Sequence, residues 1–297
     1  MKPVLANVRR MNPDPSRLAL RIPIQDSREA GADLVAARET SPRRTMNCLS
    51  RSNVADKRTS PGALRSVVFP AHSPTSQSSA EKSGLAGSGI EYVAGSGSSI
   101  SAVNRWVLGE YLDQPADVAT LTDNKYQEQE NGFNSTWNIT GKSTVVARLS
   151  WYARRYQNFS VRNFSGPRGQ ITYTLGSAAD KLRLSLGYTR EIAAYITDQS
   201  SYTITNTVSL IPTWQATQKI AVHMDFERAT WSYRGPVFVE PTPFRGDTVL
   251  SALAGVDWTP FRNVTLGASA QRSHRSSNIF TDEYNDTSVT VNASLKF

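Results

Sequence analysis

The end of the chain, YNDTSVTVNASLKF from Tyr284 to Phe297, decides the fold. Apolar side chains occupy every second position of its second half, and polar side chains fill the positions between them. Alternate residues of a β-strand share one face, so this stretch is predicted to be a strand with one apolar and one polar face. The apolar positions are Val289, Val291, Ala293, Leu295 and Phe297.

The same period of two recurs upstream, most clearly where Leu182, Leu184 and Leu186 alternate with polar residues. No stretch of the sequence approaches the roughly 18 apolar residues that a transmembrane helix needs. Alternating strands dilute their own hydropathy, so the mean hydropathy of −0.40 is compatible with strands that cross a membrane. Eleven strands are expected, at 90–94, 98–111, 133–139, 143–156, 170–175, 181–191, 202–214, 219–231, 248–258, 264–272 and 284–297.

The expected connections alternate in length along the chain. Short turns fall at 94–98, 140–142, 176–180, 215–218 and 259–263, and longer loops at 112–124, 157–168, 196–201, 234–247 and 273–283. Short turns at one end and longer loops at the other are typical of transmembrane barrels. Residues 84–297 are therefore predicted to form an all-β, antiparallel transmembrane β-barrel of the bacterial outer membrane, with the C-terminus and the short turns on the periplasmic side.

The alternation that ends in Phe297 also resembles the terminal signal that the outer-membrane assembly machinery reads. Outer-membrane lipid and that machinery are the expected partners. A soluble or secreted β-sandwich that binds carbohydrate stays open as an alternative, in which a second sheet instead of lipid would cover the apolar face.

Residues 1–83 have a different composition from the rest. Residues 1–80 carry 13 Lys and Arg against 6 Asp and Glu, and Phe69 is their one aromatic among the 27 of the chain. This segment is predicted to be disordered, because it has little to pack a core with. No signal peptide is recognisable in it. Since eleven strands is an odd number and bacterial barrels have even numbers, an N-terminal truncation or a false start is also expected. Scattered arginines without interleaved aromatics do not favour nucleic-acid binding.

From about Ser88 onward the sequence resembles a known family. The run Thr140-Gly141-Lys142-Ser143-Thr144 leads into a strand that ends Ala153-Arg154-Arg155-Tyr156, and Phe164-Ser165-Gly166 follows in the next loop. With the last strand, these features resemble the EpsL-type outer-membrane β-barrel proteins of exopolysaccharide or capsule biosynthesis, which are linked to exosortase loci. The resemblance implies a non-enzymatic role in exporting or assembling a surface polysaccharide. A general porin-like channel is the alternative.

Candidate site residues lie on the polar faces of the expected strands. Arg148, Arg154 and Arg183 could hold anionic sugar groups in an aqueous lumen, or could form structural ion pairs with Asp225, Glu227 or Asp257. His223, with Asp225 and Glu227, is expected to belong to a charge network that lines the lumen, and an acid–base site is the minor alternative. Four tryptophans near strand ends suit an interfacial girdle. They are Trp151, Trp214, Trp231 and Trp258.

No catalytic site is predicted from the sequence. The three histidines, His72, His223 and His274, lack the spacing of metal ligands, and the single Cys48 forms no zinc motif. No nucleophile and base can be paired for a hydrolase or an acyltransferase. We therefore expect no enzyme activity, no cofactor and no metal.

Overall fold

The structure is a computed structural model that describes residues 17–25, 64–72, 81–112, 115–177, 179–197, 199–236, 238, 244–279 and 282–296. In the described residues the regular structure consists of β-strands and a short 3-10 helix, η1 (Ser160–Arg162). No helix among them is long and apolar enough to cross a membrane. The strands are β1 (Arg17–Gln25), β2 (Leu64–His72), β3 (Glu81–Val93), β4 (Ser99–Tyr111), β5 (Lys125–Thr140), β6 (Ser143–Tyr156), β7 (Phe164–Leu175), β8 (Leu182–Ala194), β9 (Tyr202–Gln215), β10 (Ile220–Arg234), β11 (Gly246–Phe261), β12 (Val264–Ser277) and β13 (Tyr284–Lys296).

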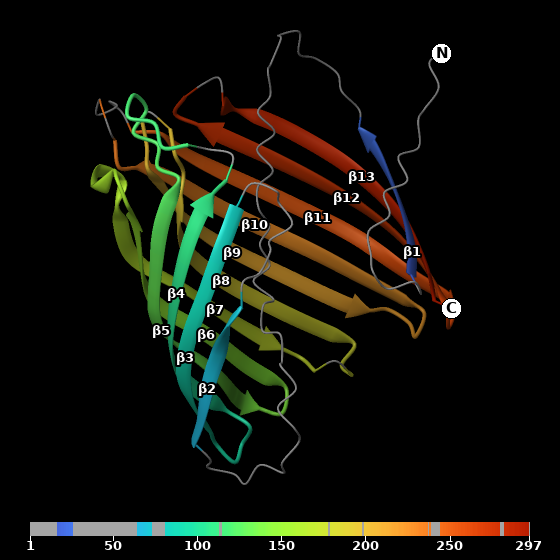
Figure 1. The fold of residues 1–297 in the computed structure, drawn as a ribbon. Coiled ribbons are helices and arrows are strands. Elements are labelled where there is room, and N and C mark those ends of the chain that lie inside the picture. Colours follow the sequence, from blue (N-terminus) through green and yellow to red (C-terminus); the bar gives the residue numbers. More distant parts are fainter. Residues whose placement is uncertain are drawn as a thin grey trace, which may run out of the picture.

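These strands form one antiparallel sheet that curves into part of a barrel wall (Figure 1). From β2 to β13 each strand pairs with its neighbours in the sequence, and β1 pairs with β13, with Leu20 opposite Ala293. Within the described residues the two edge strands, β1 and β2, are not paired with each other, so the sheet is open. The predicted all-β, antiparallel, barrel-type fold is confirmed, and β3–β13 match the eleven expected strands in order.

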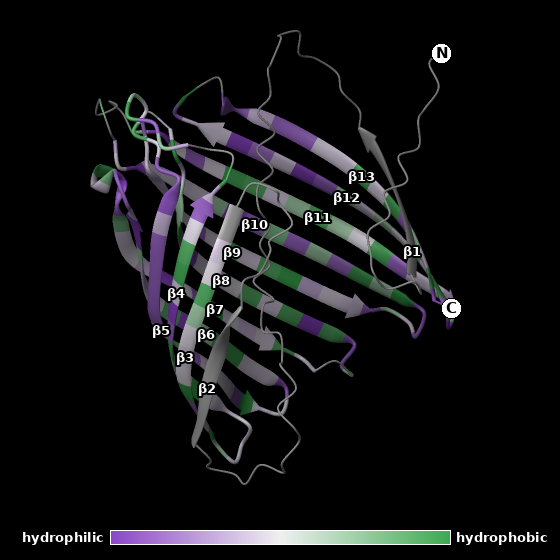
Figure 2. Ribbon diagram, viewed as in Figure 1, coloured by the Kyte–Doolittle hydropathy of each residue, from purple (hydrophilic) through white to green (hydrophobic). Residues whose placement is uncertain are grey.

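The two faces of the sheet differ in chemistry, because cross-strand pairing brings like positions together. Phe133 lies opposite Leu149, and Leu186 lies opposite Leu210. These apolar side chains are exposed, with 48% of Leu186 accessible, whereas most polar positions between them are half-buried. Curvature crowds side chains on the concave side of a sheet and separates them on the convex side. The polar face is therefore the concave inner face and the apolar face is the convex outer face, and Figure 2 shows the alternation along the strands.

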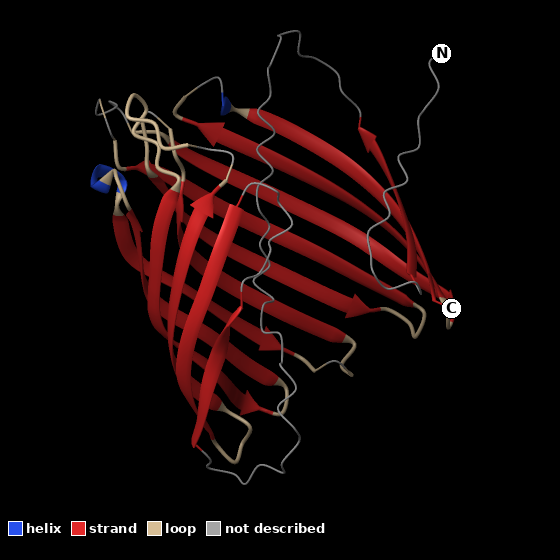
Figure 3. Ribbon diagram, in the orientation of Figure 1, coloured by secondary structure: helices blue, strands red, loops and turns tan. Residues whose placement is uncertain are grey.

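The connections alternate in length along the chain, as the sequence predicts. Those at 94–98, 141–142, 176–181, 216–219 and 262–263 have two to six residues, and those at 112–124, 157–163, 195–201, 235–245 and 278–283 have six to thirteen, each longer than the connections before and after it. Gly97 and Gly176 have φ of +76° and +93° in two of the short turns, a conformation that glycine adopts without steric cost. The two kinds of connection lie at opposite ends of the strands (Figure 3).

Several strands are longer than expected at the end with the longer loops. β5 begins at Lys125 and not at residue 133, and β7 begins at Phe164 within the loop expected at 157–168. Glutamate, glutamine and asparagine alternate in the first half of β5, so this half has no apolar face from which a strand could be recognised. The inner face of a barrel wall tolerates such residues, because it meets water.

Three strands begin within the segment predicted to be disordered. β1 and β2 lie inside residues 1–83, and β3 begins at Glu81. Residues 1–16, 26–63 and 73–80 lie outside the described residues, as does Cys48. The predicted division of the chain into 1–83 and 84–297 stays a prediction.

Candidate functional site on the inner face

Charged side chains of the inner face are distributed unequally around the sheet. Among the described side chains on β3–β8, five arginines accompany four glutamates: Arg105, Arg148, Arg154, Arg168 and Arg183 with Glu91, Glu128, Glu130 and Glu191. On β9–β13, two basic residues accompany five acidic ones: Arg275 and Lys296 with Asp225, Glu227, Asp247, Asp257 and Asp286. The inner face is thus mixed on one part of the wall and acidic on the other.

The mixed part contains an ion-pair cluster centred on two glutamates of β5. Glu128 lies 3.1 Å from Nη1 of Arg154 and accepts a hydrogen bond of 2.6 Å from the Tyr152 hydroxyl. Glu130 lies 3.5 Å from Arg105 and 3.6 Å from Arg168. Because alternate residues of β5 point to the same face, the two carboxylates lie one above the other, with arginines from three neighbouring strands around them.

Arg154 is buried in this cluster, with 6% of its surface exposed. Its Nη2 donates a hydrogen bond of 2.8 Å to the Tyr111 hydroxyl, and its guanidinium carbon lies 3.6 Å from the ring centre of Tyr126. Ion pairing, hydrogen bonding and a cation–π contact engage the same guanidinium. Its acidic partner is Glu128, and not one of the three carboxylates on β10 and β11 that the sequence suggested.

The three arginines predicted to contact anionic sugars do not converge on one site. Arg154 lies toward the longer loops, and Arg148 lies further along β6 and donates from Nε to Asn134 Oδ1 at 3.0 Å. Arg183 is exposed on the inner face beside the short turn at 176–181. Their contact with a sugar stays a prediction.

His223, Asp225 and Glu227 lie on the inner face at alternate positions of β10, and their role as a lumen charge network stays a prediction. His223 Nδ1 is 3.4 Å from Asp257 Oδ2 on β11. Asp225 Oδ1 is buried without a hydrogen-bond partner among the described residues. The histidine therefore pairs across to the next strand and not along its own strand. In the part of the chain that the structure describes, no group of three His, Cys, Asp or Glu side chains is arranged to hold a metal ion.

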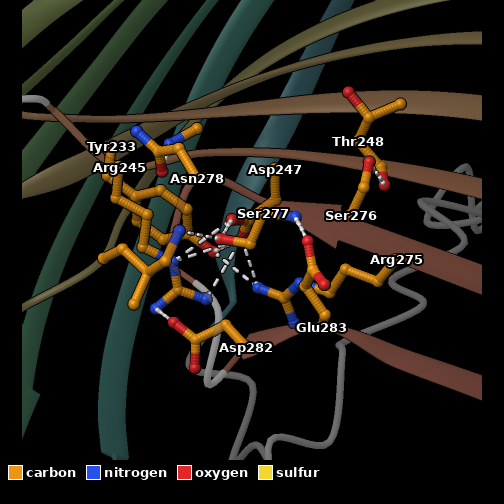
Figure 4. A network of polar contacts seen from close by, with 12 residues as sticks. Tyr233, Arg245, Asp247, Thr248, Arg275, Ser276, Ser277, Asn278, Asp282 and Glu283 are labelled. Atoms are coloured by element: carbon orange, nitrogen blue, oxygen red, sulfur yellow. Dashed lines mark hydrogen bonds and ion pairs between the residues drawn. The ribbon is translucent and has the colours of Figure 1, made fainter.

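A second cluster surrounds Asp247 on the acidic part of the wall, near the longer loops (Figure 4). The Asp247 side chain is fully buried and pairs with Arg245 at 3.1 Å and with Arg275. Tyr233 and Ser277 donate hydroxyl hydrogen bonds to it at 3.0 and 2.6 Å. These contacts join β10, β11 and β12, so they stabilise the end of the sheet where the strands lead into long connections.

Three of the longer loops are tied together by one arginine of η1. Arg162 is 1% exposed and donates to the carbonyls of Leu121 at 2.7 Å and Thr197 at 3.0 Å. Asp123 is also fully buried, and it accepts backbone hydrogen bonds from Lys125, Asn158 and Phe159. The loop end of the sheet is therefore an ordered rim.

Sequence reasoning missed most residues of the two ion-pair clusters. Glu128 and Glu130 lie between the loop expected at 112–124 and the strand expected at 133–139, although their spacing of two residues shortly before the strand of Arg154 is a usable signal. The pairing of Asp247 with Arg275 depends on the register between β11 and β12, which the sequence does not display. The prediction that Trp231 belongs to an interfacial girdle is wrong, because this residue lies on the inner face opposite Asp247. Trp151, Trp214 and Trp258 are exposed on the outer face.

The apolar residues of the C-terminal pattern that the structure describes lie on the outer face. Val289 and Val291 are 41% and 50% exposed on the outer face, and Ala293 is exposed beside them. Leu295 continues the same face of β13. Phe297 lies outside the described residues, so the role of the pattern in assembly stays a prediction.

The fold has weak similarity to solved outer-membrane proteins. OccAB3 of Acinetobacter baumannii is 12% identical with a TM-score of 0.42, over 73% of this chain and 67% of that one. The NanC porin is 10% identical with a TM-score of 0.35, over 80% of this chain and all of that one. The CymD monoaromatic hydrocarbon channel is 12% identical with a TM-score of 0.33, over 81% and 80%. No protein-family model and no curated protein sequence matches the chain.

Proposed function

We propose that this chain forms the wall of a β-barrel in the bacterial outer membrane and acts as a porin-like channel for small hydrophilic solutes, without enzyme activity. One observation carries the proposal: from β3 to β13 the sheet has an exposed apolar outer face and a polar, charged inner face. Lipid hydrocarbon would cover the apolar side chains of the outer face, and a barrel closed from this wall would enclose a path lined by polar groups.

The apolar outer face approaches the height of the apolar band of outer-membrane barrels, which is about 25 Å. On β11 it runs from Trp258 to Leu250, which spans roughly 27 Å along the strand and about 20 Å across the membrane at the usual strand tilt of about 40°. A soluble β-sandwich would cover this face with a second sheet. All thirteen described strands belong to one sheet, which favours lipid as the cover.

The unequal charge distribution supports a function in solute passage. An acidic part of the wall facing a mixed part would create a field across the lumen, and low-dielectric walls strengthen such a field. Glu128, Glu130 and Asp247 are held by arginines, so they contribute to structure. Asp225 makes no ion pair with a described residue, so it is an inner-face acidic group that we expect to attract cations.

Conductance across a planar bilayer tests the proposal. The full chain, refolded and inserted, should give discrete conductance steps, and Asp225→Asn with Glu227→Gln should lower the preference for cations. Arg272→Gln, which changes charge on the outer face, is the control and should leave the selectivity unchanged. Inserted protein that conducts no ions would overturn the channel proposal.

Export of an exopolysaccharide, which the family resemblance implies, gains no support from the comparisons. The described inner face does not distinguish a sugar polymer from other hydrophilic solutes. Membership of the EpsL-type family and a polysaccharide partner therefore stay sequence-based predictions.

A further inference from the structure

On alternate strands, the apolar outer face ends at a basic side chain on the side of the longer loops. On β8 the outward positions Leu182 to Tyr188 are apolar or aromatic and the next is Arg190. On β10 and β12 the corresponding runs end at Arg228 and Arg272. Arginine on the lipid face of a barrel costs several kcal/mol at the midplane but about 0–1 kcal/mol near the interface. These residues therefore locate the boundary between hydrocarbon and headgroups on the side of the longer loops.

The outer face of β8–β13 has no carboxylate among its described side chains. The acidic residues of these strands, Glu191 on β8 and the five on β9–β13, all occupy inner-face positions. The outer face carries Arg190, Arg228, Arg234, Arg272 and His274. Among the described side chains of β8–β13, positive charge is thus concentrated on the outer face, with no carboxylate beside it.

Two of these arginines have no hydrogen-bond or ion-pair partner among the described residues. Arg190 donates to Asn206 Oδ1 at 2.9 Å, and His274 is hydrogen-bonded to Asn285 at 2.8 Å. Arg228 and Arg272 are exposed and make no hydrogen bond or ion pair with any residue that the structure describes. A guanidinium at a membrane interface gains most from a phosphate, which it contacts in a bidentate geometry.

Arg228 and Arg272 border a shallow groove with an apolar floor. Val208, Leu210, Phe226, Leu250 and Ala252 line it, together with His274 and the inner-face residues Glu227 and Ser251. β10 and β12 are two strands apart, so the backbones that carry the two arginines are roughly 10 Å apart. In the register Arg228 is level with Val208 and Leu250, and Arg272 is level with Ala252, which lies opposite Phe226. The groove therefore offers two separated cationic groups with aliphatic and aromatic surface beside each of them.

We propose that this groove binds lipid A, the glycolipid of the outer leaflet, through its phosphates. Two phosphates on one rigid disaccharide can each reach an arginine, and acyl chains can lie along Val208, Phe226 and Leu250. A phospholipid with a single phosphate matches this spacing less well. The inference rests on the outer-membrane location proposed above, with the longer loops on the outside, but it does not require that the lumen conducts.

The binding of purified lipid A to the refolded full chain in detergent, measured by native mass spectrometry, tests the groove. Arg228→Gln with Arg272→Gln should weaken binding about tenfold or more, since charge-assisted hydrogen bonds to phosphate are lost. Arg148→Gln with Arg183→Gln removes two positive charges from the inner face and is the matched control, with binding unchanged. Dephosphorylated lipid A should bind the unaltered chain as weakly as lipid A binds the outer-face variant.

Equal affinity of the outer-face variant and the unaltered chain, or equal binding of dephosphorylated lipid A, would overturn the inference. The outer-face variant should keep the conductance and selectivity of the unaltered chain. Loss of lipid binding with conductance retained supports the groove. If the chain binds lipid A through these arginines but never conducts ions, the channel proposal fails and the lipid A inference stands.

Discussion

Leu186 and Ser185 are neighbours in β8 whose side chains face different surroundings. Leu186 is 48% exposed on the outer face and lies within an apolar run, whereas Ser185 points inward and is half-buried. In a strand, one step along the chain moves a side chain to the other face. The pair therefore tests the assignment of the two faces at a single position.

Leu186→Arg should lower the free energy of unfolding in lipid vesicles by about 2–4 kcal/mol, the cost of arginine near the bilayer midplane. Ser185→Arg should cost much less, because its side chain enters the polar interior. Urea titration of both variants in the same lipid measures the difference. Equal costs for the two substitutions would contradict the assignment.

Asp123 links the loops at 112–124 and 157–163, and its protonation should loosen them. Burial by itself would raise the pKa of this carboxyl, but hydrogen bonds from Asn158, Lys125 and Phe159 outweigh it and hold the pKa below the usual 3.8. A depressed pKa means that the contribution is full above 3.8 and is lost as the pH falls through the lower value of the folded protein.

Hydrogen exchange of the amides at 157–163 measures this effect. At neutral pH, Asp123→Asn should raise the exchange rates, after correction for intrinsic rates, and the unaltered chain should approach the variant only as the pH falls below 3.8. Asp117→Asn is the control, because the Asp117 carboxylate accepts hydrogen bonds within its own turn, from Ala119 and Thr120. Protection that is independent of pH would argue against the link.

At the scale of the element, β13 combines a structural and an expected assembly role. It pairs with β12 over its whole length, and its outward positions Val289, Val291 and Ala293 are exposed. The same residues that need lipid are those that the assembly machinery is expected to read. The strand can therefore be altered at its terminal residue without changing its described pairing.

Deletion of Phe297 should lower the amount of protein assembled in the outer membrane when the chain is expressed behind a working signal peptide. The expected reason is loss of the terminal aromatic group from the apolar pattern. Membrane fractionation with quantitative blotting measures the yield, and Lys296→Gln is the control on the inner face. Normal insertion of the deletion variant would show that the pattern is not an assembly signal.

At the scale of the whole molecule, stability comes from the sheet and not from a central core. The buried hydrophobic cluster lies near the longer loops, where Tyr126, Tyr152, Tyr156, Phe164 and Ile192 pack together. Elsewhere the inner face is polar and the outer face is exposed. The continuous backbone pairing from β2 through β13 to β1 then holds the wall, and we expect lipid to supply the apolar contacts.

A sheet stabilised in this way should resist detergent until it is heated. The refolded full chain should migrate differently on a gel when it is not boiled, because a barrel that stays folded binds less detergent than the unfolded chain. Electrophoresis of boiled and unboiled samples is the measurement. Identical migration of both samples, after refolding has been verified by circular dichroism, would count against a closed barrel.

The sequence by itself determined the class of fold, the order of the eleven strands and the face on which most side chains lie. Alternation of apolar and polar residues is local, so it can be read from Leu182, Leu184 and Leu186 alone. The same reading placed His223 and Asp225 on the inner face and the C-terminal valines on the outer face. It failed in the first half of β5, where both faces are polar.

Only the tertiary structure decided which charges meet. Arg154 pairs with Glu128 and Arg275 with Asp247, because register aligns residues 26 and 28 positions apart in the sequence. Cross-strand register depends on the pairing of whole strands, and no local pattern of charge specifies it. Strand pairing also brings Arg228 and Arg272 to the same groove. β11 lies between the strands that carry them and therefore sets their separation.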